Sequence, residues 1–531
     1  MILELCCQRT KAWAVTVGIF ILLIMTAFLG ISSFRNHSYL SYDITEMIYH
    51  ALVVKSGRIP YVDDVTHHFM GYVFPLMFLN SPDAVWCLSA SYICITALLA
   101  FMLAKELGLP NVRVLLATVA VTIGWLYGWV GFIFELQSQA LPLIWLLLVS
   151  LARAWRLQSS RMMAGAGFLL GIMAVMDQRL ILYGSMMFLP LCHSSWLNRK
   201  RAVATAMVFV ALVPSLAGLW LYAHGALWSC VQHALIFPLS MRNKGVPFSI
   251  LEFLKKGVDA EPMAAALIGI GFLICLAVRA VPKPYRVIYL SVTVLGLIYS
   301  VLGGRYYIHY LLVLQPAVVL STGLLACAIS FRYLKGLLFA LCGSYMLFPI
   351  CVGIGAGRWT LPVDDLVMRN AAEVVRKNSD FGEEVLVWGP APSIYLYSER
   401  RTSFPDMGLY SALGANYESN QLEDQGIDPQ MSVLLKNYLT DTAPIIFVYY
   451  ETMRDRNPEF IGPASNSYVL HPLGPPMKQM DFKHLPHLEY VKDLISNRYE
   501  RVATFEGEFD RAEVYKLRPY VAPGIINGQT S

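Results

Sequence analysis

Acids and histidines concentrate in one short stretch, residues 41–69 of a chain of 531 residues. They are Asp43, Glu46, His50, Asp63, Asp64, His67 and His68. Only 12 of the 36 acidic residues precede Arg358, and five of those 12 lie between Asp43 and Asp83. Titratable groups are therefore gathered here, inside a region that otherwise avoids acids.

The spacing within "YDITEMIYHA" predicts a helix with one polar face. Asp43, Glu46 and His50 stand at i, i+3 and i+7, so they share a side of the helix. The other side carries Ile44, Met47, Ile48 and Ala51. Such a helix would lie along a membrane surface, where a carboxylate within hydrogen-bond reach can take a proton from a hydroxyl nucleophile. A solvated helical face with an N-capping acid is the alternative.

Two cations follow the acids, and they suggest a phosphate ligand. Lys55 and Arg58 offer charge-assisted hydrogen-bond donors. "GRIPY" then ends the helix, and "VDDVTHHF" adds a second polar patch. Group transfer from a lipid phosphate needs a base for the acceptor hydroxyl and cations for the departing phosphate. This chemistry requires no metal.

The pair His67-His68 is the candidate for a metal site. Adjacent histidines on one helix point apart, and the sequence contains no CxxC pair or other metal-type spacing. A contact to sugar or lipid is therefore favoured, with a divalent metal as the alternative. We expect no cofactor.

The composition predicts a polytopic α-helical membrane protein. The chain is 56% hydrophobic and 15% charged, with a mean hydropathy of +0.52, and apolar runs of about 20 residues span a bilayer. We expect about eleven spans, near residues 13–33, 83–104, 112–131, 137–152, 162–176, 180–193, 203–222, 262–279, 286–302, 307–330 and 334–354. No basic-aromatic patch or fold motif indicates nucleic-acid binding.

Lysine and arginine predict the orientation, because cytoplasmic loops are enriched in them. A cytoplasmic N-terminus, with Arg9 and Lys11, places the basic turns on the same side. Those turns contain Lys105, Arg113, Arg153, Arg156, Arg161, residues 198–201, Arg279, Lys283, Arg286, Arg332 and Lys335. The loops 34–82 and 223–261 then face outward, and an odd number of spans places the C-terminal tail outside with them.

The composition changes near Trp359 to that of a soluble domain. We expect a transmembrane domain, residues 1–357, with a large first external loop at 34–82, and a small α/β extracytoplasmic domain at 358–531. In the latter "VDDLVMRNAAEVVRKN" is predicted to be helical, and "EVLVWG" and "IIFVYY" to be buried strands. "YERVATFEGEFDRAEVYKLR" predicts a closing hairpin. No GxGxxG, P-loop or GxSxG motif occurs there.

Three patches resemble a known family, the GT-C glycosyltransferases that use polyprenyl-phosphate sugars, among them protein mannosyltransferases and aminoarabinose transferases. The first is similar to their first external loop through Asp43, Tyr49, Ala51, Gly57, Pro60, Tyr61, Asp63 and Pro75. "GGRYYIHYLLVLQPAVVL" resembles the entry to a late span, and "EEVLVWGPAPSIYLYSERR" the start of their external domain. The resemblance covers most of the chain in layout, but only these patches in motif.

The resemblance implies roles for individual residues. Asp43 would be the catalytic base; many relatives have adjacent Asp-Glu, whereas here Glu46 follows three residues later. The donor phosphate would be held by Lys55, Arg58, Arg305 and His309. The acceptor and sugar would lie near His50, Tyr61, Asp63, His67 and His68. Interfacial anchoring is the alternative for Arg305 and His309.

The function implied is transfer of a sugar from a polyprenyl-phosphate donor to a hydroxyl of a glycan, lipid or protein, with inversion. It would occur on the outer face of the inner (plasma) membrane. The alternative is a non-enzymatic lipid or polysaccharide transporter, or an envelope-assembly protein. In "MDQR", Asp177 and Arg179 either pair or act functionally, since charges at membrane depth are functional candidates. Glu135, Trp388 and Tyr395 are expected to be structural.

Overall fold

The computed structural model describes most, but not all, of the chain. The described residues are 42–64, 66, 68–79, 82–108, 136–193, 196–236, 251, 254–255, 257–258, 262–277, 281–302, 308–328, 336, 340–341, 365–388, 391–405, 429–452, 493–507 and 510–519. The chain divides into two compact units with the main boundary between Leu361 and Pro362; the short segment 63–65 groups with the second unit. We call them the membrane unit and the C-terminal unit.

The membrane unit is a bundle of apolar helices. Its elements are α4 (Pro82–Glu106), α6 (Leu136–Leu157), α7 (Ser160–Met176), η2 (Gln178–Cys192), α8 (Arg199–Ala223), α12 (Pro262–Ala277), α13 (Lys283–Leu302), η4 (Ile308–Leu314) and α14 (Gln315–Ala328). Within the described residues, four helical stretches are long and apolar enough to cross a membrane: Cys87–Glu106, Gln139–Leu157, Arg199–Ala223 and Lys283–Leu302. The chain is therefore a multi-pass helical membrane protein.

The predicted spans coincide with these elements wherever the structure describes them. The pair predicted at 162–176 and 180–193 forms α7 and η2. The predicted spans 13–33, 112–131 and 334–354 lie outside the described residues, apart from positions 336, 340 and 341. The total of about eleven therefore stays a prediction.

The segment η2 is a 3-10 helix, and its burial has the corresponding period. A 3-10 helix has three residues per turn, so side chains at i and i+3 lie in one row. One buried row consists of Leu180, Tyr183, Met186 and Leu189, and beside it Met187 and Pro190 are buried as well. Ile181, Phe188 and Leu191 are exposed. η2 thus presents an apolar face to the bundle that widens toward its C-terminal end.

Glycine allows α7 and α8 to pack closely. A Cβ at Gly167 would lie 2.2 Å from the carbonyl oxygen of Ala206, and one at Gly171 would lie 3.0 Å from that of Val210. The spacing Gly167-xxx-Gly171 is the small-residue pattern that lets membrane helices approach backbone to backbone. The close contact between α7 and α8 therefore depends on the absence of a side chain at Gly167 and Gly171.

Buried polar bonds tie the later helices to the bundle. Trp145 Nε1 of α6 donates to Gln315 Oε1 of α14 at 2.6 Å. Tyr285 of α13 donates its hydroxyl to the backbone oxygen of Leu320 at 2.6 Å. Each donor is satisfied inside an apolar environment, where an unmet polar group is costly.

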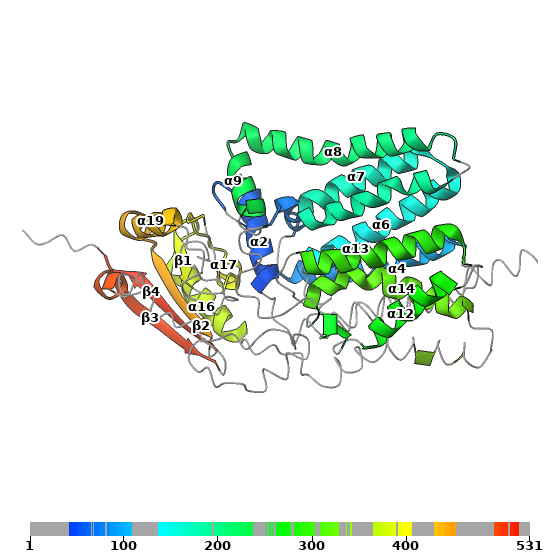
Figure 1. Cartoon of the computed structure of the whole chain (residues 1–531). Helices are drawn as coiled ribbons and strands as arrows, with labels where there is room; N and C mark the ends of the chain where they lie inside the picture. Colours follow the sequence, from blue (N-terminus) through cyan, green and yellow to red (C-terminus); the bar gives the residue numbers. More distant parts are fainter. Residues whose placement is uncertain are drawn as a thin grey trace, which may run out of the picture. The chain divides into compact units, whose positions relative to one another are not determined.

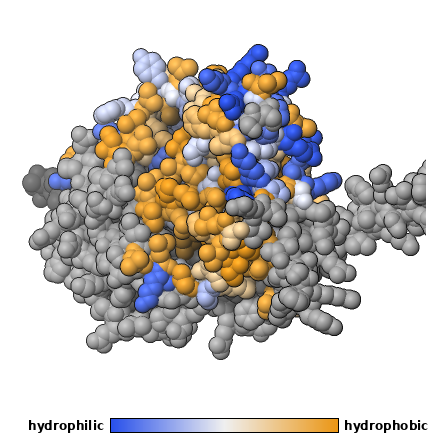
Figure 2. Space-filling model, turned by 45° about the vertical axis from the view of Figure 1, so that its right-hand side comes forward, coloured by the Kyte–Doolittle hydropathy of each residue, from blue (hydrophilic) through white to orange (hydrophobic). Residues whose placement is uncertain are grey.

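Large apolar side chains also cover the outside of the membrane unit. On α8 they include Val208, Leu216 and Leu219, and on α12 Leu273 and Leu276, each well exposed. Figure 2 shows hydrophobic residues gathered over one face, with hydrophilic residues along one side of it. Apolar patches of this extent on a soluble protein would be a liability, but they are the expected surface of a helix bundle in lipid.

The two ends of the bundle differ in chemistry. At one end Arg156 of α6 pairs with Glu106 of α4 at 3.0 Å, and Lys283 donates to the backbone oxygen of Cys192 at 2.7 Å. We call this the basic end, since α7 and α8 also begin here beside Arg161 and residues 199–201. It corresponds to the basic turns of the sequence.

The opposite end carries the segment that was predicted to be the first external loop. This loop contains α2 (Tyr42–Lys55), η1 (Met70–Tyr72) and α3 (Val73–Leu76), and it meets α9 (Leu227–Val231) and η3 (Gln232–Ile236). Gln139, near the start of α6, contacts Met47 of α2, whereas α6 ends at Arg156 on the basic side. One helix therefore separates the loop end from the basic end, and Figure 1 shows α2 and α9 at the same end of the bundle.

The C-terminal unit is a four-stranded sheet with helices. Its strands are β1 (Val385–Trp388), β2 (Ile446–Thr452), β3 (Tyr499–Glu506) and β4 (Asp510–Leu517), in the order β1-β2-β4-β3. β1 and β2 are parallel, and β4 is antiparallel to both β2 and β3. α16 (Asp365–Asn378) packs on β2, β3 and β4. The predicted helix, strands and closing hairpin all form.

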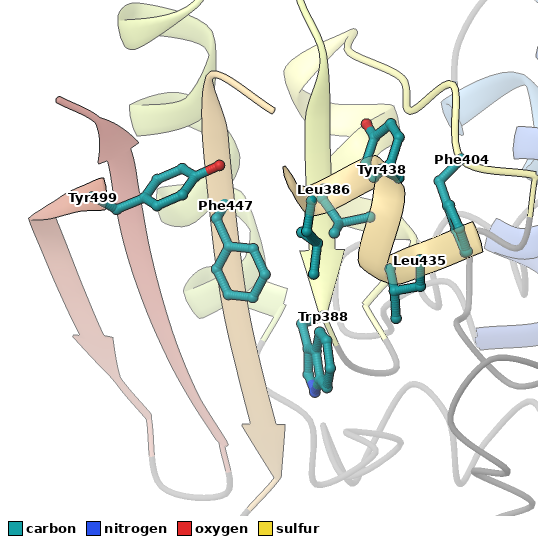
Figure 3. Packing of buried hydrophobic residues seen from close by; sticks show 8 residues of the cluster. Leu386, Trp388, Phe404, Leu435, Tyr438, Phe447 and Tyr499 are labelled. Carbon is teal, nitrogen blue, oxygen red and sulfur yellow. The ribbon is translucent and has the colours of Figure 1, made fainter. Parts of the chain in front are cut away.

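The core of this unit fills the other face of the sheet, between it, α19 (Pro429–Asn437) and η6 (Tyr438–Thr442). Figure 3 shows Leu386, Trp388, Phe404, Leu435, Tyr438, Phe447 and Tyr499 converging there. Trp388 is 3% exposed, and Tyr395, in α17 (Ser393–Ser398), is 1% exposed. Both aromatics serve packing, as the sequence indicated, rather than a sugar platform.

Candidate functional site

The predicted helix over "YDITEMIYHA" forms, but it is buried on more than its apolar side. α2 runs from Tyr42 to Lys55. Met47 and Ala51 are 5% and 0% exposed, as expected, yet His50 is 1% exposed. The predicted surface helix with a wet face is therefore wrong at His50, because the bundle and the loop enclose α2 there.

Glu46 and His50 form a pair on this helix. Nε2 of His50 lies 3.3 Å from Oε1 of Glu46, one turn away, and the side chains are 1% and 12% exposed. A carboxylate in this position orients the imidazole ring. Asp43 lies one turn before Glu46 on the same helix, and its side chain is outside the described set.

The two cations that follow α2 lie where the chain turns back. Lys55 is exposed at the last turn of the helix, and Arg58 is half-buried. Gly57 between them has φ +89, a conformation that glycine adopts without steric cost. This turn places both cations directly after the helix that bears the acids.

Tyr61 holds the second half of the loop together. Its hydroxyl donates to the backbone oxygen of His68 at 2.8 Å and accepts from the backbone N–H of Met70 at 2.9 Å. Ser229 of α9 donates to the Tyr61 carbonyl oxygen at 2.5 Å. Burial raises the pKa of Tyr61 well above its usual value. These contacts bind Tyr61 into the loop, so a role next to the acceptor stays a prediction.

The second polar patch is only partly described. Asp64 is 2% exposed and Asp63 is half-buried. His68 is half-buried, with its ring edge-to-face on that of Tyr72 at 6.3 Å. His67 lies outside the described residues. Among the residues that are described, no three His, Cys, Asp or Glu side chains gather in the manner of a metal site.

The start of η4, which contains one of the predicted late-span residues, lies at the same end of the bundle. Arg305 lies outside the described residues, while His309 belongs to η4 with its side chain outside the described set. Tyr310, the next residue, is 9% exposed and rests on Tyr299 of α13, ring centroids 6.4 Å apart. The start of η4 is thereby fixed against the end of α13.

A buried ion pair lies beside these two tyrosines. Arg179 donates from Nε to Asp177 Oδ1 at 3.0 Å and from Nη2 to Oδ2 at 2.7 Å. Asp177 Oδ1 also accepts the backbone N–H of Arg179 at 2.9 Å, which caps the start of η2. Tyr299 donates its hydroxyl to Asp177 Oδ2 at 2.5 Å. The carboxylate is thus fully engaged in a bidentate, charge-assisted arrangement.

The guanidinium of Arg179 contacts two aromatic rings. Its Cζ is 4.5 Å from the ring centroid of Tyr299 and 4.3 Å from that of Tyr310. Both distances are within the range of cation–π attraction. η2, α13 and η4 are therefore joined at one point.

Gln137 and Gln139 link this ion pair to the first loop. They stand two residues apart in the first turn of α6. Gln139 reaches Met47 of α2 at 3.4 Å, and Gln137 reaches the hydroxyl of Tyr299 at 3.5 Å. The helix α2, the Asp177–Arg179 pair and η4 are consequently neighbours of one helix end.

Sequence reasoning found only part of this cluster. "MDQR" singled out Asp177 and Arg179, because charges between apolar runs are conspicuous. It gave no indication of Tyr299, Tyr310 or Gln137, whose types are common in apolar spans and at their ends. Their signal is spatial: they come from three elements distant in the sequence.

Comparisons with known proteins give a limited result. No protein-family model and no curated protein matches the chain. Among solved structures, it is similar to the oligosaccharyltransferase of Archaeoglobus fulgidus tethered to an acceptor peptide, with TM-score 0.46 and 10% identity over 94% of this chain and 74% of that one. It is also similar to ArnT of Cupriavidus metallidurans bound to undecaprenyl phosphate, with TM-score 0.41 and 12% identity over 95% and 98%.

Both of these proteins are GT-C glycosyltransferases, the family that the sequence resemblance indicates. At TM-scores of 0.46 and 0.41 the likeness by itself assigns neither a detailed fold nor an activity to this chain. The arrangement of its own residues must carry any functional conclusion.

Proposed function

We propose that the chain is an integral membrane glycosyltransferase of the GT-C type, using a polyprenyl-phosphate sugar as donor. The observation that carries this proposal is the gathering of α2, with its acids, the Asp177–Arg179 pair and the start of η4 at the end of the bundle opposite the basic turns. Acids and cations at one end of a lipid-embedded bundle suit a reaction between a lipid phosphate and a polar acceptor.

The reaction proposed is an inverting displacement. The carboxylate of Asp43 takes the proton of an acceptor hydroxyl, whose oxygen attacks the anomeric carbon of the sugar. The bond from that carbon to the phosphate oxygen breaks, and polyprenyl phosphate leaves with the electron pair. The attack comes from the face opposite the leaving group, so the anomeric configuration inverts. Glu46, paired with His50 one turn later, supports the negative field in which the base works.

The departing phosphate requires positive charge. Lys55 at the end of α2 and Arg58 just after it are proposed to supply part of it, together with Arg305 and with His309 of η4. Cationic donors placed where charge develops are commonly the largest contribution to such a step. The lipid tail of the donor would lie along the apolar flank of the bundle.

The orientation proposed places the loop end outside the cell membrane and the basic end in the cytoplasm. The contacts that put Lys283 and Arg156 at one end are the support, since cytoplasmic loops are rich in lysine and arginine. The C-terminal domain, 358–531, would then be extracytoplasmic and near the acceptor. Its boundary and role are part of the proposal.

The competing function is a lipid or polysaccharide transporter or an assembly protein. A transporter typically has discontinuous helices and charges near mid-membrane. Here the Asp177–Arg179 pair stands at the junction of α7 and η2, at the loop end. Charges at the end of a membrane span favour a reaction at the membrane surface over transport across the membrane.

Sugar transfer from a synthetic polyprenyl-phosphate donor by the purified full-length protein tests the proposal. We expect Asp43→Asn to lower turnover by about 100-fold or more, the usual worth of a general base. Glu106→Gln, at the basic end, is the matched control and should keep wild-type turnover. Full activity of Asp43→Asn would remove the assigned base, and movement of lipid without transfer by the wild type would favour the transporter.

A further inference from the structure

The guanidinium of Arg179 is fixed on three sides and open on one. Nε and Nη2 bind Asp177, and the rings of Tyr299 and Tyr310 lie against the group, with their centroids 4.5 and 4.3 Å from Cζ. Nη1 forms no hydrogen bond with any described residue, and the side chain keeps 10% exposure. A mostly buried arginine thus retains a donor edge that the protein itself does not use.

This donor edge stays accessible from outside the protein, since the Arg179 side chain keeps 10% exposure. If Arg179 served only to neutralise Asp177, the bidentate pair and the capping bond would suffice. The open edge needs an acceptor that is not a described part of the chain, either water or a ligand oxygen.

We propose that the Nη1 edge of Arg179 binds an oxygen of a phosphate group, at the loop end of the membrane unit. A guanidinium offers two parallel N–H donors per edge, which match two oxygens of a phosphate. Asp177 and the tyrosine rings hold the fork in place before the ligand arrives, so little side-chain freedom is lost on binding. The residues expected from the sequence to hold phosphate do not include Arg179.

The chemical class of the ligand follows from the surroundings. Asp177 cancels the formal charge of Arg179, so the edge supplies hydrogen bonds and a local dipole rather than a free cation. The neighbouring His309 and the cations after α2 would provide net positive charge. A phosphate attached to a lipid reaches this end with its tail along the apolar flank of the bundle, and a soluble phosphate reaches it from water.

This inference rests on the proposed function for the identity of the lipid, but it does not need turnover to be tested. The experiment measures the dissociation constant of the full-length protein in detergent. The probes are a synthetic polyprenyl phosphate, the matching neutral polyprenol, and inorganic phosphate. The first two separate the phosphate group from the lipid tail, and the third separates a lipid headgroup from a free anion.

Arg179→Lys and the double variant Asp177→Asn/Arg179→Gln both remove the open edge. The lysine keeps the ion pair, and the double variant leaves no charge unpaired, so at least one should fold. We expect each to bind polyprenyl phosphate about tenfold more weakly, the worth of one charge-assisted contact, with polyprenol binding unchanged. The control, Arg156→Gln/Glu106→Gln at the basic end, should bind as the wild type does.

Weakened inorganic phosphate binding in the same variants would assign the edge to free phosphate as well as to the lipid.

The proposal would be overturned if the wild type, Arg179→Lys and the double variant bound polyprenyl phosphate with equal affinity. It would also be overturned if the variants lost affinity for polyprenyl phosphate and for polyprenol by the same factor. The proposed reaction can fail separately. Full turnover in Asp43→Asn would dismiss the assigned base without altering these dissociation constants.

Discussion

The two ends of the membrane unit each hold an arginine–carboxylate pair, in different environments. At the loop end, the Arg179 and Asp177 side chains are 10% and 2% exposed. At the basic end, those of Arg156 and Glu106 are 55% and 14% exposed. The first pair also takes part in a helix cap, a tyrosine hydrogen bond and a stacked arrangement, whereas the second joins only the ends of two helices.

The comparison shows that the burial of a salt bridge, and not its mere presence, determines its structural role. Exposed pairs contribute little, because water already solvates each partner. A buried pair fixes geometry, and removing one partner leaves a charge that nothing neutralises. The buried pair at the loop end therefore fixes the positions of its side chains, whereas the basic end tolerates changes in the positions of its paired side chains.

The largest effect is expected from removing one buried partner. Arg179→Leu leaves the Asp177 carboxylate unpaired, which should cost about 3–5 kcal/mol of stability. Thermal unfolding in detergent should show a strongly lowered midpoint or no folded protein. The change Arg179→Leu/Asp177→Leu, which removes both charges, should recover much of the loss. Equal destabilisation by the single and double changes would contradict this account.

A smaller difference in stability is expected between alanine substitutions at two glycines, Gly71 at the loop end and Gly165 near the basic end. A Cβ at Gly71 would lie 2.4 Å from the carbonyl oxygen of Val175, whereas one at Gly165 meets nothing within 4 Å. Gly71→Ala should therefore push the first loop off α7 and cost about 1–3 kcal/mol. Gly165→Ala should be neutral or stabilising by up to about 1 kcal/mol. The unfolding midpoints of both variants measure the contrast, and a similar midpoint for both would refute it.

The smallest effect belongs to the exposed pair. Arg156→Gln/Glu106→Gln should change stability by no more than about 1 kcal/mol. Added salt should have little further influence on this variant, since the screened interaction is gone. A loss as large as that of Arg179→Leu would mean that exposure does not separate the two ends.

Hydropathy and local pattern predicted most of the fold. The apolar runs gave the described spans because each must bury its backbone bonds within one segment. The closing hairpin, 499–518, followed from alternation over two neighbouring segments. The sheet order β1-β2-β4-β3 did not follow, because pairing between distant strands has no local signal.

The candidate site was predicted less completely. The helix bearing Asp43, Glu46 and His50 forms, but the burial of His50 depends on elements that close over it from elsewhere in the chain. The contacts of Arg179 with the rings of Tyr299 and Tyr310 join residues more than 100 positions apart. The spacing of residues within one segment predicts only which of them share a helix face. It does not predict contacts between segments that are distant in the sequence.

The 3-10 form of η2 has a consequence for how the chain traverses lipid. Its 15 residues advance about 2.0 Å each, or about 30 Å in total, which matches the hydrocarbon thickness of a bilayer. The same stretch wound as an α-helix would reach only about 22 Å. The 3-10 form therefore lets 15 residues cover this length while Arg179, the second residue of η2, stays at the loop end.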